Sequence, residues 1–223
     1  CLRDNIWEGH LEIVNRNIKS GQTSCYIFEV GNVFYKNSEF IQEEILNGAI
    51  FGNKKFGAWV NSGKDNDLNY YEARGKLKEA LSSLNIKVDD KPTNSIDFLH
   101  PGRTAKLFIE GKDAGYFGEI HPKLILDKTA LKKVYLFSIN VANLLGASTR
   151  KNKWIPIYKQ YPIVPKMERD INFIFSKEHL ISEITSEIRK TGKNLLEDVN
   201  LIDVFKDINF GEDFISYTFR LSY

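Results

Sequence analysis

Cysteine is scarce in this sequence, since Cys1 and Cys25 are the only two among 223 residues. They form no metal-binding pattern and no disulfide framework, so a reducing compartment is the simple expectation. Long apolar runs are also missing, and none approaches the roughly 20 residues that a membrane-spanning helix needs. The first ten residues contain neither a basic leader nor an apolar signal core. The sequence therefore predicts no membrane partner.

Motifs that would mark a catalytic centre are absent as well. The sequence contains no Gly-x-Ser-x-Gly, no Gly-x-x-x-x-Gly-Lys and no His-Glu-x-x-His. His100 and His121 could bind a metal or form an acid–base pair if the fold brought them together, but no carboxylate cluster accompanies them. The alternative is that both histidines, with Arg103 and Glu119, make hydrogen bonds and ion pairs that fix the ends of a hairpin.

What is present is the composition of an ordinary globular protein, with 42% apolar and 27% charged residues. The net charge of +2 does not by itself indicate nucleic acid. Between positions 150 and 170, however, six cations face only Glu168 and Asp170, which gives +4: Arg150, Lys151, Lys153, Lys159, Lys166 and Arg169. This segment is either a solvated basic connector or a cationic surface for a polyanion.

The first two thirds of the chain alternate helical and strand patterns. Apolar spacing predicts helices over 2–18, 69–84 and 141–145, with Asp67 capping the second and Gly146 stopping the third. Strands are predicted over 25–34, 44–51 and 134–139. The central element is a hairpin whose strands cover 104–110 and 114–120, joined by a turn at 111–113 and preceded by a sharp turn at His100-Pro101-Gly102-Arg103.

The last third, from 154 onward, predicts a second unit in the order strand, helix, strand, strand. The strands are expected over 171–175, 195–206 and 214–221, and the helix runs from a Ser176 cap to Gly192. A complete ferredoxin-like fold needs one further helix and strand. The expected fold class is therefore α+β, with domains over 1–148 and 154–223 and a truncated ferredoxin-like βαββ unit at the end.

Several stretches resemble the β subunit family of phenylalanine–tRNA ligase. They are the segment from His100 to Arg103, Gly118-Glu119-Ile120-His121-Pro122, Phe28-Glu29-Val30-Gly31 and Tyr71-Glu72-Ala73-Arg74-Gly75. Arg74 stands where that family usually has lysine. The lead-in Pro165-x-x-x-Arg169-Asp170 and the segments around 195–205 resemble the ferredoxin-fold anticodon-binding domain of the same family.

The resemblance implies that residues 1–148 are a class II synthetase-like antiparallel sheet with flanking helices and no working active site. An α subunit would supply amino-acid and ATP binding, in an assembly of two α and two β chains that uses ATP and magnesium outside this segment. No cofactor or metal is expected here, and the chain reads as a fragment truncated at both ends. Structural or subunit-interface roles are expected for Glu29, His100, Pro101, Gly102, Arg103, Glu119 and His121. Glu29 could be buried with a partner or lie on a solvated strand face.

The same resemblance implies that the second unit contacts the anticodon region of phenylalanine tRNA, in the cytoplasm or a plastid stroma. The cations expected to meet RNA are Lys159, Lys166, Arg169 and Lys206. Arg169 could instead pair with Asp170 or a neighbouring acid. The acidic stretch 197–213 should repel RNA. A stand-alone ferredoxin-like module that binds RNA or protein without a role in aminoacylation is the alternative.

Overall fold

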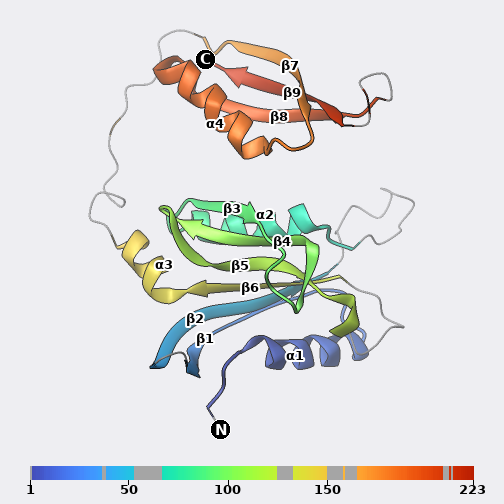
Figure 1. The fold of residues 1–223 in the computed structure, drawn as a ribbon, viewed down its shortest axis with the longest axis vertical. Coiled ribbons are helices and arrows are strands. Elements are labelled where there is room, and N and C mark those ends of the chain that lie inside the picture. Colours follow the sequence, from blue (N-terminus) through green and yellow to red (C-terminus); the bar gives the residue numbers. More distant parts are fainter. Residues whose placement is uncertain are drawn as a thin grey trace. The chain divides into compact units, whose positions relative to one another are not determined.

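The structure is a computed structural model and describes residues 2–36, 39–52, 67–124, 133–149, 158, 165–207, 211 and 213–223. The chain divides into two compact units, Cys1–Pro156 and Ile157–Tyr223 (Figure 1). The predicted boundary between 148 and 154 falls largely on residues outside the described ranges.

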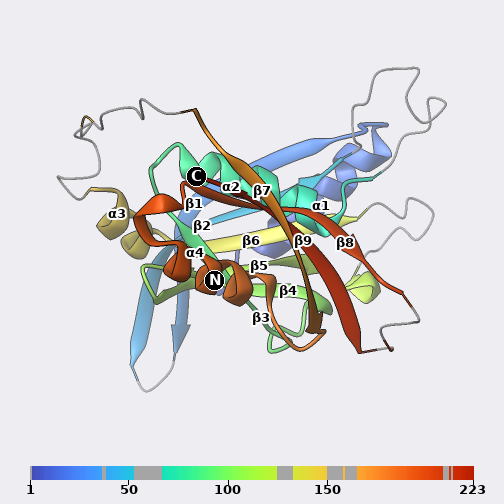
Figure 2. The ribbon, with the colours of Figure 1, turned by 90° about the horizontal axis from the view of Figure 1, so that it is seen from above.

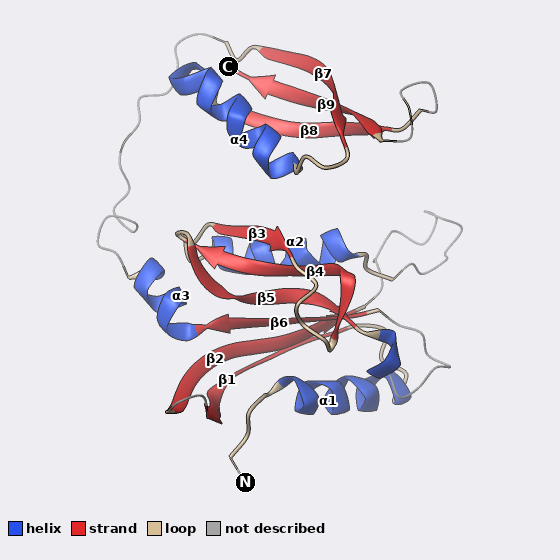
Figure 3. Ribbon diagram, in the orientation of Figure 1, coloured by secondary structure: helices blue, strands red, loops and turns tan. Residues whose placement is uncertain are grey.

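The first unit is built on one six-stranded antiparallel sheet, whose strands lie in the order β1-β2-β6-β5-β4-β3. Three helices flank it (Figure 3). The strands are β1 (Cys25–Lys36), β2 (Phe40–Phe51), β3 (Val88–Pro92), β4 (Leu99–Ile109), β5 (Lys112–Ile120) and β6 (Val134–Asn140), and the helices are α1 (Trp7–Lys19), α2 (Tyr70–Ser82) and α3 (Val141–Ser148).

Both faces of this sheet are filled by alternating side chains, as the period of two predicts. On β6, Tyr135 and Phe137 belong to the cluster beneath α2 and α3, whereas Val134 and Leu136 belong to the cluster beneath α1. All four are buried. The sheet is therefore the middle layer between helices on its two faces.

Three helix-boundary predictions are wrong, and a pair of hydrogen bonds explains the first. Asn69, not Asp67, caps α2: its side chain accepts from the Glu72 amide at 3.0 Å, and the Glu72 carboxylate accepts from the Asn69 amide at 2.8 Å. Helix α3 continues past Gly146 to Ser148. Ser176 does not cap α4, which begins only after Leu180.

The central hairpin is displaced from its prediction by two features. Its turn is Glu110-Gly111, with φ of 52° and 80°, so Lys112 already belongs to β5. Two positive φ values fit the two-residue turns that match strand twist. The His-Pro-Gly-Arg segment is not a turn before the strand but lies inside β4, at a shift in its pairing with β5 between Leu99 and Thr104.

The second unit is a three-stranded antiparallel sheet in the order β7-β9-β8 with one helix packed on it. Its elements are β7 (Glu168–Ser176), α4 (Ile181–Gly192), β8 (Asp198–Phe205) and β9 (Phe214–Ser222). Strand β8 starts later than predicted because Lys193–Leu195 form a short 3-10 turn, η4. The predicted α+β class, a large antiparallel sheet with flanking helices followed by a βαββ unit, is confirmed.

Helix α4 covers one face of the β7-β9-β8 sheet, against Tyr217 and Phe219 among others (Figure 1). Residues of β9 with even numbers point to the opposite side, which we call the open face. Of the helices in the described ranges, none is long and apolar enough to cross a membrane.

Candidate functional site

The His-Pro-Gly-Arg segment is held by an ion pair at the end of the β4–β5 hairpin. Arg103 donates through Nη1 to both carboxylate oxygens of Glu119, at 3.0 and 3.1 Å. The Glu119 side chain is only 8% exposed, whereas that of Arg103 is 45% exposed. Burial of the acid makes its pairing with Arg103 necessary, because an unpaired buried carboxylate is costly.

The two histidines act as local acceptors for backbone amides. His100 Nδ1 accepts from the Gly102 amide at 3.1 Å, and His121 Nδ1 accepts from the Lys123 amide at 3.2 Å. Leu99 pairs with Ile120, so both histidines lie at the same end of the hairpin. Pro101 is exposed beside them. Across the described residues, no group of three or more histidine, cysteine, aspartate or glutamate side chains is placed to hold a metal.

Glu29 on β1 is neither fully buried nor unpaired. Its side chain is 44% exposed, and Oε1 lies 2.7 Å from Nη1 of Arg3. Arg3 also donates to the Asn32 carbonyl at 3.2 Å and accepts from the Phe34 amide at 2.9 Å. The pair therefore ties the segment before α1 to the β1 edge.

Arg74 has a structural role that the sequence did not reveal. Its Nε donates to Asp90 Oδ2 at 2.7 Å, and Nη2 donates to the other carboxylate oxygen. The guanidinium lies 5.9 Å from the centre of the Phe117 ring. Nη1 is buried and has no partner in the part of the chain that the structure describes. The pair joins α2 to β3.

A second buried polar pair lies beneath α1. His10 and Asn47 are 3% and 0% exposed, and His10 Nδ1 lies 2.8 Å from Asn47 Oδ1. Asn47 pairs across the sheet with Ser138, which pairs with Tyr116. Burial raises the pKa of the Tyr116 phenol to about 12. A lone histidine on an otherwise apolar helix face was the available signal.

The cations predicted to meet RNA are not gathered on one surface. Lys159 lies outside the described residues. Lys166 and Arg169 are exposed near the start of β7, and Lys166 Nζ is 3.5 Å from Glu168. Lys206 is exposed after the end of β8. Because β7 and β8 both run antiparallel to β9, the starts of β7 and β8 share one end of the sheet, and Lys206 lies at the other.

Asp170 is paired with Arg220 rather than with Arg169. Arg220 donates from Nε and Nη2 to the two Asp170 oxygens, both at 2.8 Å. These hydrogen bonds lower the pKa of Asp170, with the positive charge of Arg220 adding to the effect. Arg169 pairs with Leu221, a residue of the α4-side core, and so lies on that side of β7.

The open face carries its side chains in rows across the three strands, which the pairing register defines. A first row holds Ile174, Ser216 and Phe205. A second row holds Asn172, Thr218 and Asp203, and a third holds Asp170, Arg220 and Asn200. In the middle, Asn172 Nδ2 donates to Ser216 Oγ at 2.8 Å and to Thr218 Oγ1 at 2.9 Å.

The first row is apolar at both ends. Ile174 is 48% exposed and Phe205 is 52% exposed, although both belong to sheet strands. Phe214, at the start of β9, is 45% exposed on the same side. The open face thus combines an apolar and aromatic end, a polar middle and an ion-paired arginine.

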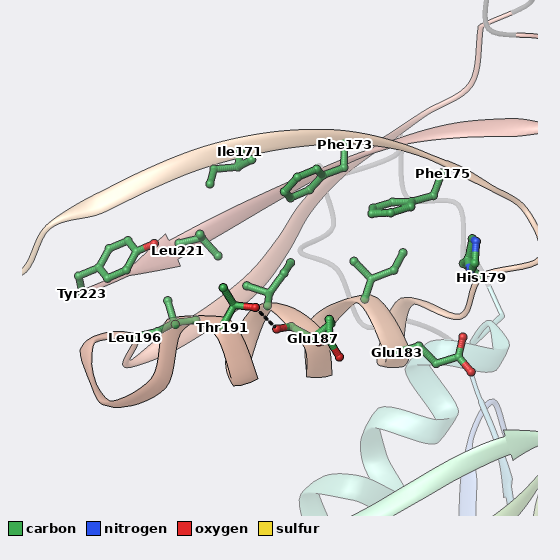
Figure 4. A pocket seen from close by; sticks show the side chains of 13 residues that line it. Ile171, Phe173, Phe175, His179, Glu183, Glu187, Thr191, Leu196, Leu221 and Tyr223 are labelled. Carbon is green, nitrogen blue, oxygen red and sulfur yellow. Dashed lines mark hydrogen bonds between the residues drawn. The ribbon is translucent and has the colours of Figure 1, made fainter.

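The opposite side of the sheet has a different character. A groove of about 680 Å³ runs between α4 and β7 (Figure 4). Phe173 and Phe175 point across it toward the helix, and Glu183 and Glu187 belong to the helix wall. A mostly apolar groove with two glutamates in its wall is unfavourable for phosphate.

Two family models match the chain, one within each compact unit. Residues 1–141 match the family described as phenylalanyl tRNA synthetase beta chain CLM domain, and residues 162–223 match the ferredoxin-fold anticodon binding domain. Among solved structures, a pyrrolysyl tRNA synthetase of Desulfitobacterium hafniense aligns over 66% of this chain and 51% of its own, with a TM-score of 0.46 and 13% identity.

Curated relatives align over all 223 residues. The chain is 84% identical to a protein named phenylalanine–tRNA ligase beta subunit from Prochlorococcus marinus strain MIT 9312. It is 67% and 45% identical to proteins of the same name from strains CCMP1986 and NATL2A. The chain spans 27% of the length of each of these relatives. Its two matched regions and its relatives place the chain in the phenylalanyl-tRNA synthetase beta chain family, as a stretch covering a CLM domain and a ferredoxin-fold anticodon-binding domain.

Proposed function

We propose that this chain works within the β subunit of phenylalanine–tRNA ligase, where it supports subunit assembly and holds the anticodon region of phenylalanine tRNA. Bond-making with ATP and magnesium belongs to the companion α subunit, in an assembly of two α and two β chains. The protein would work where tRNA is charged, in the cytoplasm or a plastid stroma. The observation that carries the RNA half of this proposal is the open face of the β7-β9-β8 sheet.

The scaffold half of the proposal is supported by how the six-stranded sheet is filled. Phe117, Tyr135 and Leu136 are completely buried at its centre, toward both faces. The Arg3–Glu29 pair lies at the β1 edge with both side chains partly exposed, and the Arg103–Glu119 pair lies at the end of the β4–β5 hairpin with only its arginine well exposed. In this proposal these pairs hold the hairpin ends and β1 in place for subunit contact, together with His100, Pro101, Gly102 and His121. The domain boundary is proposed to lie between 148 and 154.

The open face suits unstacked bases better than duplex RNA. Bases stack on exposed aromatic rings such as Phe205 and Phe214, at about 1–3 kcal/mol per base. The Thr218 hydroxyl can donate to a base edge, and Asn172 Oδ1 keeps a second lone pair that can accept from one, because both Asn172 Nδ2 hydrogens are already used within the row. Among the described residues this face has few free cations, and it carries Asp203 from the acidic 197–213 stretch, so phosphate contacts would come from its margin, where Lys166 and Lys206 are exposed and Lys159 is predicted. Arg169 lies on the α4 side of β7 and would reach phosphate from that side of the strand.

Binding of phenylalanine tRNA to the 223-residue chain tests the RNA half. The Phe205→Ser variant should weaken binding about tenfold if one base stacks on that ring. The matched control is Tyr71→Ser, which removes an 82% exposed ring from α2 of the other unit and should leave affinity unchanged. Equal affinity for wild type and Phe205→Ser would overturn the assignment of this face.

Salt dependence separates phosphate contacts from structural roles. If Lys166 or Arg169 touches phosphate, replacing it with alanine should lower the slope of log affinity against log salt by about one. An unchanged slope with lower thermal stability would make the residue structural. Aminoacylation by this chain without an α subunit would contradict the proposal that the α subunit carries out the bond-making.

A further inference from the structure

The β1–β2 hairpin carries an apolar surface on the side away from α1. Tyr26, Phe28 and Val30 are 55%, 73% and 51% exposed. Their neighbours Cys25 and Ile27 point the other way and pack against the α1 cluster. An alternation in which both sides are apolar differs from the usual solvated strand face. The sequence pattern of this strand therefore indicates burial on two faces.

The surface continues toward the tip of the hairpin. Phe34 pairs with Gln42 and lies 6.3 Å, ring centre to ring centre, from Phe40, which is 63% exposed. Figure 2 shows this tip reaching beyond the other strands of the sheet. Pairing agrees, because β6 accompanies β2 only from Ile45 onward. We name Tyr26, Phe28, Val30, Phe34 and Phe40 the hairpin face.

The hairpin face is the uncovered extension of a buried layer. Val30 pairs with Leu46 and Tyr26 pairs with Ile50. Leu46 and Ile50 belong to or pack on the cluster that α2 and α3 cover. Gly48 lies opposite Phe28, and a Cβ on Gly48 would lie 2.4 Å from the Phe137 ring. The buried core therefore reaches the residue next to the hairpin face.

Apart from Arg3, which is hydrogen-bonded to Asn32 and Phe34, the described residues leave the edge of β1 uncovered. Within the described ranges, β1 pairs only with β2, along twelve residues. Long open edges with apolar side chains are aggregation hazards, which proteins avoid by short strands, bulges, prolines or inward charges. The Cys25–Lys36 strand has no proline and pairs with β2 without a register shift. Such an edge calls for a protein cover.

Charge identifies the class of partner. The charged residues at the tip and along this side are Lys36, Glu39 and Glu44, all exposed. Two acids and one lysine give no attraction for RNA phosphates. A protein surface with apolar side chains and a basic margin is the complementary partner.

We propose that the hairpin face is the docking surface for the companion subunit of the ligase, which lays an apolar segment across it and a basic side chain beside Glu44. This inference rests on the proposed function, because that function supplies the second subunit. It adds the surface and its chemistry.

The test uses the full-length β chain and its α subunit. The double variant Tyr26→Ser with Phe28→Ser should weaken α–β association by about tenfold to a hundredfold, measured by titration and sedimentation, since buried aromatic anchors dominate interfaces. Its thermal unfolding should stay close to wild type, because both rings are exposed in the isolated chain. The matched control replaces two other exposed apolar residues, Tyr71 and Leu145, with serine and should assemble normally.

The outcomes separate this inference from the proposed function. If wild-type β binds α and tRNA but the hairpin variant binds α equally well, the docking surface is overturned and the function stands. If wild-type β binds neither, the proposed function itself fails. If β alone dimerises through this face, shown by loss of dimer in the hairpin variant with unchanged α binding, a second copy is the occupant and the inference is again overturned.

Discussion

Arg220 and Asp170 face each other across β9 and β7, joined by two hydrogen bonds of 2.8 Å. Arg220 also lies 3.9 Å from Glu168. Arg220, a cation of the open face, therefore has two acids beside it, so its long-range attraction of RNA to the centre of this face is weak. Recognition there depends on neutral and aromatic groups, with phosphate contacts at the margin.

This pair makes the second unit sensitive to acid. The pKa of Asp170 is lowered in the folded state by its hydrogen bonds to Arg220, so its contribution to stability is present above the unfolded pKa of about 3.9. The contribution is lost as the pH falls through the lower folded pKa. In urea unfolding, the free energy of unfolding of Asp170→Asn should fall less between pH 7 and pH 3 than that of the wild type. Asp198, whose pKa is lowered chiefly by Arg189, should behave alike. Identical pH profiles for Asp170→Asn and wild type would contradict this reading.

Alkaline pH tests burial in the first unit. Burial raises the pKa of Tyr70 and Tyr116 to about 12, above the unfolded value of about 10. Their stabilisation is fully present below pH 10 and declines between pH 10 and 12, because only the unfolded chain then releases these protons. Phenolate absorbance should show exposed tyrosines titrating first. If every tyrosine ionised in one step near pH 10 while the fold persisted, these burial assignments would be wrong.

Replacing Arg74 with lysine should cost less folding stability than removing its partner Asp90. Asp90→Ala leaves a buried guanidinium uncompensated and should lower the free energy of unfolding by about 2–4 kcal/mol. Arg74→Lys keeps one charged contact and removes the unpartnered Nη1, so a loss of no more than about 1 kcal/mol is expected. Denaturant midpoints with unchanged slopes give both values. A larger loss for Arg74→Lys than for Asp90→Ala would refute the argument.

Two glycines should respond to alanine in opposite directions. Gly115 has φ of +139°, and a Cβ there would lie 1.9 Å from the Ser138 carbonyl oxygen. Gly115→Ala should therefore cost about 3 kcal/mol or more. Gly75 lies inside α2 with nothing within 4 Å of its Cβ position, so Gly75→Ala should add about 0.5–1 kcal/mol. Melting temperatures provide the comparison, and destabilisation by Gly75→Ala would show that α2 packs differently.

The sequence predicted the layout well because burial imposes clear periods. Tyr135, Phe137 and Ile139 share one face of β6, and the alternation on β9 marks its core side, as expected. Predictions failed where two candidates for one local role lie close together. Asp67 and Asn69 are both good caps, and only the reciprocal bond with Glu72 selects Asn69.

Long-range partners were the other limit. Arg74 and Asp90 are 16 residues apart, and nothing local shows that α2 and β3 meet. Arg220 was visible only as a polar residue on an alternating strand, while its partner Asp170 lies 50 residues away. The pairing register of β7 with β9 is the missing information, and it comes from tertiary packing.

Hydrogen exchange of the assembled α/β ligase, with and without phenylalanine tRNA, reports directly on whether the open face holds the anticodon region. We expect slower exchange in β7 and β9 on tRNA binding, with a smaller response to a tRNA of altered anticodon loop. Protection confined to the α1-to-α3 unit, or unchanged exchange in β7 and β9 at saturating tRNA, would contradict it.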